Sequence, residues 1–511
     1  MLKRIKSSIL ALSLLVNLPV LFEAPIIAQF IAEKRLFDIW IIWGGSFGFA
    51  FGLIFIAPLW KNIPSETENG FHLFRYEGKW AQWLYSFRAV FLGLMVVPLI
   101  ASLNLHSFAA LFSLGSGLSG TMVVAVICVA LLFTTHLNTM SQRFRIDAVV
   151  GLLGIIVLFT LGIFWLFHYH GYNEVQSQIS FQLFPESSGT LLMLLFFNWM
   201  LTGIFDFPDM EGQKLLYARH RGKFAQWILL VSLMLFAQIF IFLLGLHSAF
   251  EYSGSINQIK GEVLVGTFIA HQHTLHKCLF LGLLLVSFLA VLMNLQLWTG
   301  QLLQSVIPFT SVKFPHLPGM LIFLVGLVFW SLNTDGLWHI ARYLLVITAG
   351  VGPVFLLRWY WRRITAQVQF IAMLAGLLVG NFYEISFKYW LWFKNTMLNL
   401  SAFLELSHYL TEVLISGIVT LCIWLLVALS SQGTSQEKWQ SFQWTTGALA
   451  RLKNKTLWLL LFIMLAIIVC AKILAWSIGF GHFRYGVLSG VFILICGVLM
   501  HLFYKKADSI E

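Results

Sequence analysis

The chain has 511 residues, of which 59% are hydrophobic and 10% charged, and its mean hydropathy is +0.85. Soluble globular proteins average about 45–50% apolar and about 25% charged residues. This composition excludes a soluble enzyme, a disordered protein and an ordinary nucleic-acid-binding protein. The formal net charge of +11 then indicates basic loops on the cytoplasmic face of a membrane, and no nucleic-acid partner is expected.

Apolar runs separated by short polar loops predict an all-α polytopic membrane protein of about 14 transmembrane helices, because one span takes ~20 apolar residues. The predicted spans, in chain order, are 9–31, 38–60, 84–112, 118–134, 146–168, 189–205, 225–248, 276–308, 317–332, 337–357, 366–381, 411–429, 456–478 and 483–504. No appended soluble domain is visible, so we expect a single membrane domain.

The distribution of basic residues predicts that both termini are cytoplasmic. With the amino terminus inside and the loops alternating, most of the 32 Lys and Arg residues fall in inner loops, as the positive-inside rule requires. Outer loops keep only Lys34, Arg35, Lys260, Lys388, Lys394 and Arg484. Lys277, Arg342 and Lys472 lie near outer helix ends, where a long side chain can snorkel to the interface.

Two predicted helices carry signs of interruption. In the first, Pro19 and Pro25 flank Glu23 at mid-membrane depth, close to Asn17. A proline removes a backbone donor and frees a carbonyl, and a carboxylate within a span often marks function. Glu23 is read as a proton carrier, as a partner of a cationic solute, or as a structural acid.

The sixth predicted helix has a similar pattern near its end. Polar or breaking residues interrupt the apolar run at Asn198, Thr202, Gly203 and Pro208, and acidic residues follow. The alternative reading is a kinked helix that passes into an ordinary loop near Asp206. Interruptions five helices apart are typical of two inverted five-helix repeats with a binding site at the midplane.

Several loops resemble the sodium/solute symporter family. Residues 74–79 (FRYEGK) and 87–94 (FRAVFLGL) resemble the passage that enters the third core helix of that family. Residues 209–220 resemble, with some glycines missing, the passage after its sixth helix. Residues 352–364, followed by Ala372 and Met373, resemble its GP…LRWYWWR…AAM segment, and the similarity continues through residues 436–439 and the last two helices.

The resemblance implies a LeuT-like fold with a 5+5 inverted-repeat transport core at residues 1–357 and peripheral C-terminal helices at 358–511. It also implies secondary active transport of a small organic solute across a bacterial inner membrane, usually driven by sodium. The solute site would lie between the broken first and sixth helices, with the third, eighth and tenth contributing. The substrate-binding candidates are Asn17, Glu23, Asn198, Trp199, Thr202, Asn294, Gln296 and Trp298.

One departure from the family concerns the coupling ion. The family holds sodium with a pair of Ser/Thr hydroxyls on the eighth helix, whereas an ungapped alignment brings Ala290 and Val291 to these positions. Neither side chain has an oxygen, and Ser287, one turn earlier, is the nearest substitute. The coupling ion is therefore Na⁺ or H⁺, and for H⁺ the Glu23 carboxylate would be the carrier.

The remaining features do not suggest an enzyme or a cofactor. His271, His273 and His276 are close in sequence, but their spacing does not bring all three to one helical face, so exposed histidines are expected rather than a metal site. The five cysteines lie in or beside apolar helices and are expected to be core residues.

The sequence thus predicts a symporter of a small organic solute that works by alternating access. The alternatives are an uncoupled facilitator and a non-transporting sensor or assembly protein on the same fold. A carboxylate near the site favours a polar or cationic solute over an anion.

Overall fold

The protein is helical throughout the part of the chain that the computed structural model describes. That part comprises residues 20–33, 39–134, 140–168, 238–251, 260–306, 317–333, 337–403, 408–479 and 483–508, apart from positions 61, 66, 68 and 305. It contains no strand. Five helices are long and apolar enough to cross a membrane: Gly78–Ser116, Thr274–Gln304, Ala366–Tyr389, Thr411–Ser430 and Lys455–Ile478. The chain is therefore an all-α, multi-pass membrane protein, as predicted.

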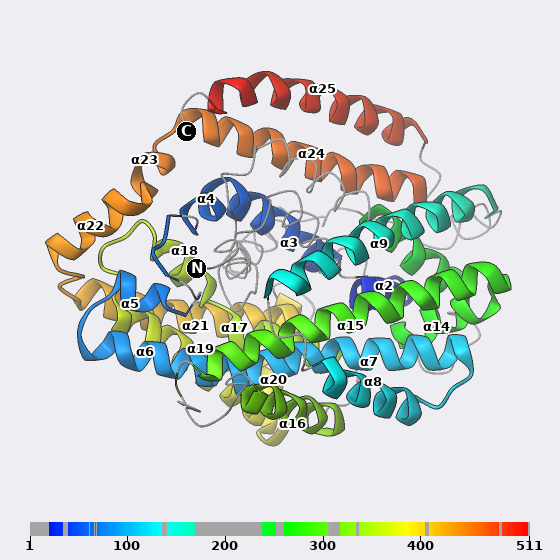
Figure 1. The fold of residues 1–511 in the computed structure, drawn as a ribbon, viewed down its shortest axis with the longest axis horizontal. Coiled ribbons are helices and arrows are strands. Elements are labelled where there is room, and N and C mark those ends of the chain that lie inside the picture. The colour runs from blue at the N-terminus through cyan, green and yellow to red at the C-terminus, as the bar shows by residue number, and fades with distance from the viewer. Residues whose placement is uncertain are drawn as a thin grey trace.

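The first half of the chain supplies the helices drawn in blue, cyan and bright green in Figure 1. They are α2 (Val20–Ala32), α3 (Ile39–Phe51), the π-helical turn η3 (Gly52–Ile56), α4 (Ala57–Trp60), α5 (Phe71–Arg75), α6 (Gly78–Phe91), the π-helical turn η4 (Leu92–Val96), α7 (Val97–Ser116), α8 (Gly120–Thr134), α9 (Met140–His168), α14 (Gly261–His271) and α15 (Thr274–Gln304). A further apolar helix spans Gln238–Glu251.

The second half supplies the remaining helices. They are α16 (Leu317–Asn333), α17 (Leu337–Thr348), α18 (Gly352–Leu357), α19 (Ala366–Tyr389), α20 (Leu391–Phe403), α21 (His408–Ser430), α22 (Gln436–Thr446), α23 (Ala448–Leu452), α24 (Lys455–Gly479) and α25 (Phe483–Asp508). The last two pack side by side along one edge of the molecule (Figure 1).

Most predicted spans within the described residues coincide with helices, but the tenth does not form one helix. The span predicted at 337–357 divides into α17 and α18 at a turn around Gly350, whose φ is +76°. A Cβ at Gly350 would lie 2.3 Å from the carbonyl oxygen of Gly417, so only glycine allows α21 to pack this closely. The Gly350 carbonyl accepts a hydrogen bond of 2.8 Å from the Trp424 indole. The short helices α14 and α20 were also not predicted.

The first helix continues through Pro25, so the predicted break at that residue is wrong. Pro25 lies inside α2, where its missing N–H removes a single hydrogen bond. Two glycines from other helices pack directly on the α2 backbone nearby. A Cβ at Gly261 would lie 1.7 Å from the Pro25 oxygen, and one at Gly245 would lie 2.8 Å from the Ala24 oxygen. The backbones at Gly245 and Gly261 therefore pack closely against the Ala24 and Pro25 carbonyls of α2.

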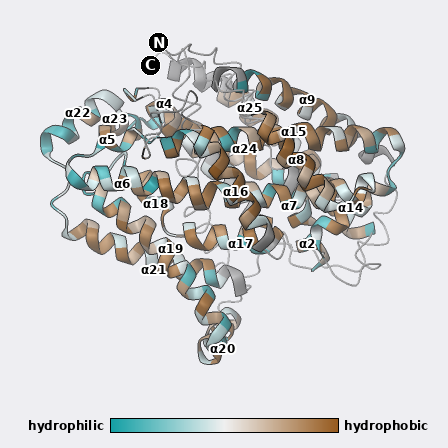
Figure 2. Ribbon diagram, turned by 60° about the horizontal axis from the view of Figure 1, so that its bottom comes forward, coloured by the Kyte–Doolittle hydropathy of each residue, from teal (hydrophilic) through white to brown (hydrophobic). Residues whose placement is uncertain are grey.

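The outer surface is apolar in a way that suits lipid. Large hydrophobic side chains are exposed on helices all around the molecule, among them Phe133, Phe329, Leu378, Phe462 and Leu494. A soluble monomer rarely exposes so much apolar surface. Figure 2 shows that α16, α19 and α24 are mostly hydrophobic, whereas α22, which lies outside the predicted spans, is mostly hydrophilic.

One buried arginine fastens the loops at the α22 end of the molecule. The Arg75 side chain is fully buried, and its Nε donates to the Arg358 carbonyl (3.1 Å). Its two terminal nitrogens donate to the Thr434 hydroxyl (3.0 Å) and the Ile364 carbonyl (3.5 Å). The guanidinium also lies 4.6 Å from the centroid of the Trp439 ring. Burial lowers the pKa of Arg75 to about 10. Because this value is still well above 7, the guanidinium remains charged at neutral pH.

A second buried arginine, Arg358, and a buried histidine, His72, lie close to Arg75. The Arg358 guanidinium lies 4.2 Å from the centroid of the Phe71 ring, in a cage of aromatic rings that includes Trp60 and Trp359. His72 is fully buried beside it, with its ring stacked on Tyr76 at 6.2 Å. Burial and the positive charges of Arg88 and Arg358 hold the pKa of His72 well below its usual range. His72 is therefore neutral in the folded protein.

Replacing Arg75 by lysine should destabilise the protein, because an ammonium cannot reach three separated acceptors in a fixed geometry. Buried acceptors left without a donor cost about 1–3 kcal/mol. Thermal unfolding of the purified R75K variant measures the loss. The exposed Arg145 is the matched control, and R145K should unfold like the wild type. Equal stability of R75K and R145K would contradict the assigned role.

The neutral His72 predicts a loss of stability at acidic pH. Below about pH 6.5 the unfolded chain binds a proton at this histidine and the folded chain does not, so stability falls as the pH is lowered. The H72F variant keeps the ring, and neither ring nitrogen of His72 makes a hydrogen bond that would be lost. H72F should therefore have a weaker acid dependence between pH 7 and pH 5, measured by thermal unfolding. Replacing the exposed His273 by Phe is the control; identical pH profiles for H72F and wild type would refute the explanation.

Candidate functional site

The candidate residues divide between described and undescribed parts of the chain. Glu23, Pro25, Ser287, Ala290, Val291, Asn294, Gln296 and Trp298 are described. The other candidates, which include the whole predicted sixth helix, lie outside the described residues: Asn17, Pro19, Asn198, Trp199, Thr202, Gly203 and Pro208. The site can therefore be built only from α2 and α15 and from the helices that contact them.

Glu23 is a buried acid that interacts electrostatically with a buried base. It lies in the first turn of α2 and is 6% exposed. Lys472 of α24 is 2% exposed, and the charges of the two side chains interact. The prediction that Lys472 snorkels at the outer helix end is wrong, because its side chain points into the protein. The compensation of a buried charge by an opposite one explains why both residues are tolerated inside the helix bundle.

Lys472 is held by two further helices. Its ammonium donates a hydrogen bond to the Gln238 side-chain oxygen and lies 5.2 Å from the centroid of the Trp43 ring. Ser46 of α3 donates to the same Gln238 oxygen at 3.0 Å. We call these five residues, Glu23, Ser46, Trp43, Gln238 and Lys472, the Glu23 network. It joins α2, α3, the helix Gln238–Glu251 and α24.

Asn294 belongs to a second buried polar contact, between α15 and α9. Its amide donates to the Asp147 carboxylate at 2.6 Å, and each side chain is 1% exposed. The buried Arg143, one turn earlier on α9, interacts electrostatically with Asp147. Sequence reasoning missed Asp147, because it stands beside basic residues at the start of an apolar run. The signal available was an acid one helical turn after Arg143, on the same face.

The other α15 candidates point in different directions. Gln296 donates to the Leu131 carbonyl of α8 at 3.5 Å, on a different side of α15 from the contact with α9. Trp298 is 2% exposed and packs within the main hydrophobic core. Asn294 and Gln296 therefore face different neighbouring helices, and the described residues do not gather all the candidates in one pocket.

The face of α15 that was proposed for sodium is apolar. Ala290 is 2% exposed and packs with Val150 of α9, and Val291 and Ile146 complete this small cluster. Ser287 is half-buried, one turn away on the same helix. Since a hard cation requires oxygen ligands, the Ala290–Val291 contact offers it none.

The three histidines around the start of α15 make separate local contacts in the structure. His271 shares a hydrogen bond of 2.8 Å with the Thr267 carbonyl, and the rings of His273 and His276 are 5.9 Å apart. Among the residues that the structure describes, no group of three or more His, Cys, Asp or Glu side chains is arranged to hold a metal ion.

Comparison with known proteins identifies the fold and no sequence family. No protein-family model matches the sequence, and no curated protein matches it. A substrate-bound, outward-open Na⁺-coupled sialic acid symporter superposes with a TM-score of 0.57 at 12% identity, covering 85% of this chain and 92% of that one. A nucleobase-cation-symport transporter, closed with bromovinylhydantoin bound, has a TM-score of 0.45 at 12% identity, covering 86% and 97%. The first likeness shows that this chain shares the helical fold of that symporter.

Proposed function

We propose that the protein is a secondary transporter that carries a small organic solute across a bacterial inner membrane by alternating access. The observation that carries this proposal is the fold, which is shared over 85% of the chain with a solute symporter. The motifs that resemble the sodium/solute symporter family support it independently of the superposition. The solute stays within the broad class of small polar organic molecules.

We further propose that a proton, and not sodium, is the coupling ion. The apolar packing of Ala290 and Val291 against α9 supports this choice, because it removes the oxygen ligands that sodium would need. Glu23 is the proton carrier in the proposed cycle. Its buried carboxylate accepts a proton and thereby loses its attraction to Lys472.

The Glu23 network suggests how that proton would act on the helices. While Glu23 is ionised, its attraction to Lys472 holds α2 against α24. After protonation, the Lys472 ammonium still has the Gln238 oxygen and the Trp43 ring, so α2 is released and the lysine remains held. Lys472 also changes the expectation for the solute. Because it compensates the charge of Glu23, the carboxylate no longer favours a cationic solute over an anionic one.

Uptake into proteoliposomes tests the function. The probes are a labelled set of sugars, polyols, amino acids, nucleosides and sialic acid, offered under an inward proton gradient or an inward sodium gradient. We expect one class to accumulate under the proton gradient, unchanged when choline replaces sodium and abolished by a protonophore. E23Q should abolish the accumulation driven by the proton gradient, and proton-driven uptake that persists in E23Q would refute the carrier role. Accumulation of no probe under either gradient would favour the sensor alternative.

A double-mutant cycle tests the Glu23–Lys472 pair without a known solute. K472Q leaves a buried carboxylate without its partner and should lower stability by about 3–5 kcal/mol. The double variant E23Q/K472Q contains no uncompensated charge and should recover most of this loss, as measured by thermal or chemical unfolding. K455Q, at an exposed position of the same helix, is the control. Additive effects of E23Q and K472Q would show that the two side chains do not interact.

A further inference from the structure

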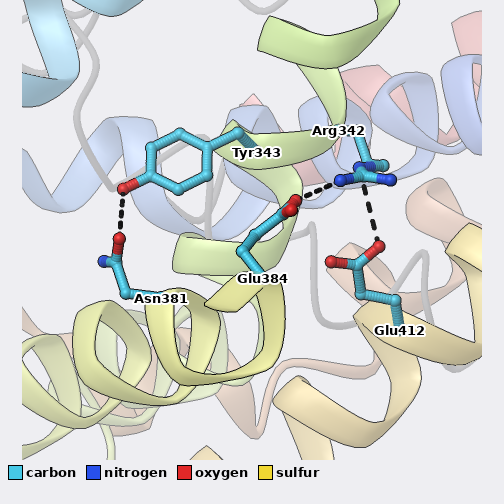
Figure 3. A network of polar contacts seen from close by, with 5 residues as sticks. All are labelled: Arg342, Tyr343, Asn381, Glu384 and Glu412. Carbon is cyan, nitrogen blue, oxygen red and sulfur yellow. Dashed lines mark hydrogen bonds and ion pairs between the residues drawn. The ribbon is translucent and has the colours of Figure 1, made fainter. Parts of the chain in front are cut away.

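A second charged cluster lies outside the Glu23 network, where α17, α19 and α21 meet. Arg342 of α17 donates a hydrogen bond to the Glu384 carboxylate of α19. The Nε atom of the same guanidinium lies 3.6 Å from Oε2 of Glu412 on α21. Next to it, the Tyr343 hydroxyl donates to the Asn381 side-chain oxygen at 3.0 Å (Figure 3). We call Arg342, Glu384 and Glu412 the Arg342 cluster.

The charges in this cluster do not balance. Two carboxylates share one guanidinium, so the cluster would carry a net negative charge if both acids were ionised. The Glu412 side chain is 1% exposed, whereas Glu384 and Arg342 are 24% and 20% exposed. An uncompensated negative charge at the buried position of Glu412 is costly. The Arg342 guanidinium is occupied by these two acids, a pairing that the expectation of a snorkelling side chain did not include.

The Glu412 carboxylate lacks a hydrogen-bond donor. Both carboxylate oxygens of Glu412 are buried and accept no hydrogen bond. Glu384 and Glu412 contact the same guanidinium, and the charges that act on Glu412 are those of Arg342 and Glu384. Among the described residues, the Tyr383 phenol of α19 is a further titratable group that interacts with Glu412. Two carboxylates held at one guanidinium can form a hydrogen bond with each other only when one of them carries a proton.

We propose that Glu384 and Glu412 form a proton-binding site, in which the two carboxyl groups share one proton and Arg342 compensates the remaining negative charge. The proton adds the positive charge that the cluster lacks and the donor that the Glu412 oxygens lack. A metal ion fits less well, because the Arg342 guanidinium already contacts both carboxylates and would repel a second cation. The described part of the chain also holds no group of three or more His, Cys, Asp or Glu side chains arranged for a metal ion.

The location of the site gives the proton a structural role. Arg342 lies on the tenth predicted span, and both acids lie on the peripheral helices α19 and α21. With the proton bound, a hydrogen bond between the two carboxyl groups and the contacts of Arg342 with both of them join the three helices. Without it, the two carboxylates repel each other and compete for one guanidinium, so the junction weakens. The proposal concerns stability and proton binding, and it does not depend on the proposed transport function.

Infrared spectroscopy and thermal unfolding of the purified full-length protein test the proposal. The wild type should show a carboxylic-acid C=O stretching band at neutral pH that both E384Q and E412Q lose. Its melting temperature should fall as the pH rises from 7 to 9, on the order of 2–4 °C for each kcal/mol lost. In E412Q the amide replaces the protonated acid as a donor, so this alkaline fall should diminish relative to the wild type. E437Q, at an exposed acid of α22, should behave as the wild type in both measurements.

Three other results would contradict the proposed proton-binding site. An unchanged carboxylic-acid band in both E384Q and E412Q would overturn the proposal, as would an alkaline fall that persists undiminished in E412Q. A melting temperature that rises with NaCl but not with choline chloride, and only while Glu412 is present, would assign the site to sodium instead. If E412Q does not fold, E384Q provides the same two measurements, since the proton is shared by both acids.

Discussion

The Arg75 guanidinium holds together parts of the protein that are far apart in the chain. Its acceptors, Arg358, Thr434 and Ile364, lie 283, 359 and 289 residues away. Through these bonds the short helix α5, the segment after α18 and the segment before α22 become one unit. The aromatic cage of Arg358 and the neutral ring of His72 are built against that unit. Without a fixed guanidinium at its centre, the α22 end of the molecule would have buried carbonyls and no common donor.

Charge compensation follows the same long-range pattern inside the helix bundle. Lys472 of α24 interacts electrostatically with Glu23 of α2, and Glu384 of α19 and Glu412 of α21 form ion pairs with Arg342 of α17. In each case one partner belongs to residues 1–357 and the other to residues 358–511. Charged groups inside a membrane protein are costly unless they are paired. The C-terminal helices therefore supply charged partners to residues of the first ten predicted spans.

Hydropathy predicts most of the described helices because a helix that crosses lipid needs a long continuous run of apolar residues. Such a run can be recognised from the local sequence alone. The break at Gly350 escaped prediction because it depends on close packing against Gly417, a residue of another helix. Conversely, the break predicted at Pro25 did not form, because α2 tolerates the loss of one hydrogen bond. Glu23 was recognised from its own chemistry, but Lys472 was not recognised as its partner. Pairing across helices is a property of the fold, and no local pattern records it.

The two glycines that pack on α2 have a consequence for how this protein changes during evolution. At Gly245 and Gly261 a single added carbon would collide with the backbone of α2, and backbone cannot move aside as a side chain can. These positions admit one amino acid, whereas lipid-facing positions such as Phe462 need only remain apolar. Among descendants of this sequence, substitutions should therefore be most frequent at lipid-facing positions and absent at the two glycines that contact the α2 backbone. In an alignment of such sequences, Gly245 and Gly261 would be invariant within otherwise variable helices, and they would mark where those helices contact α2.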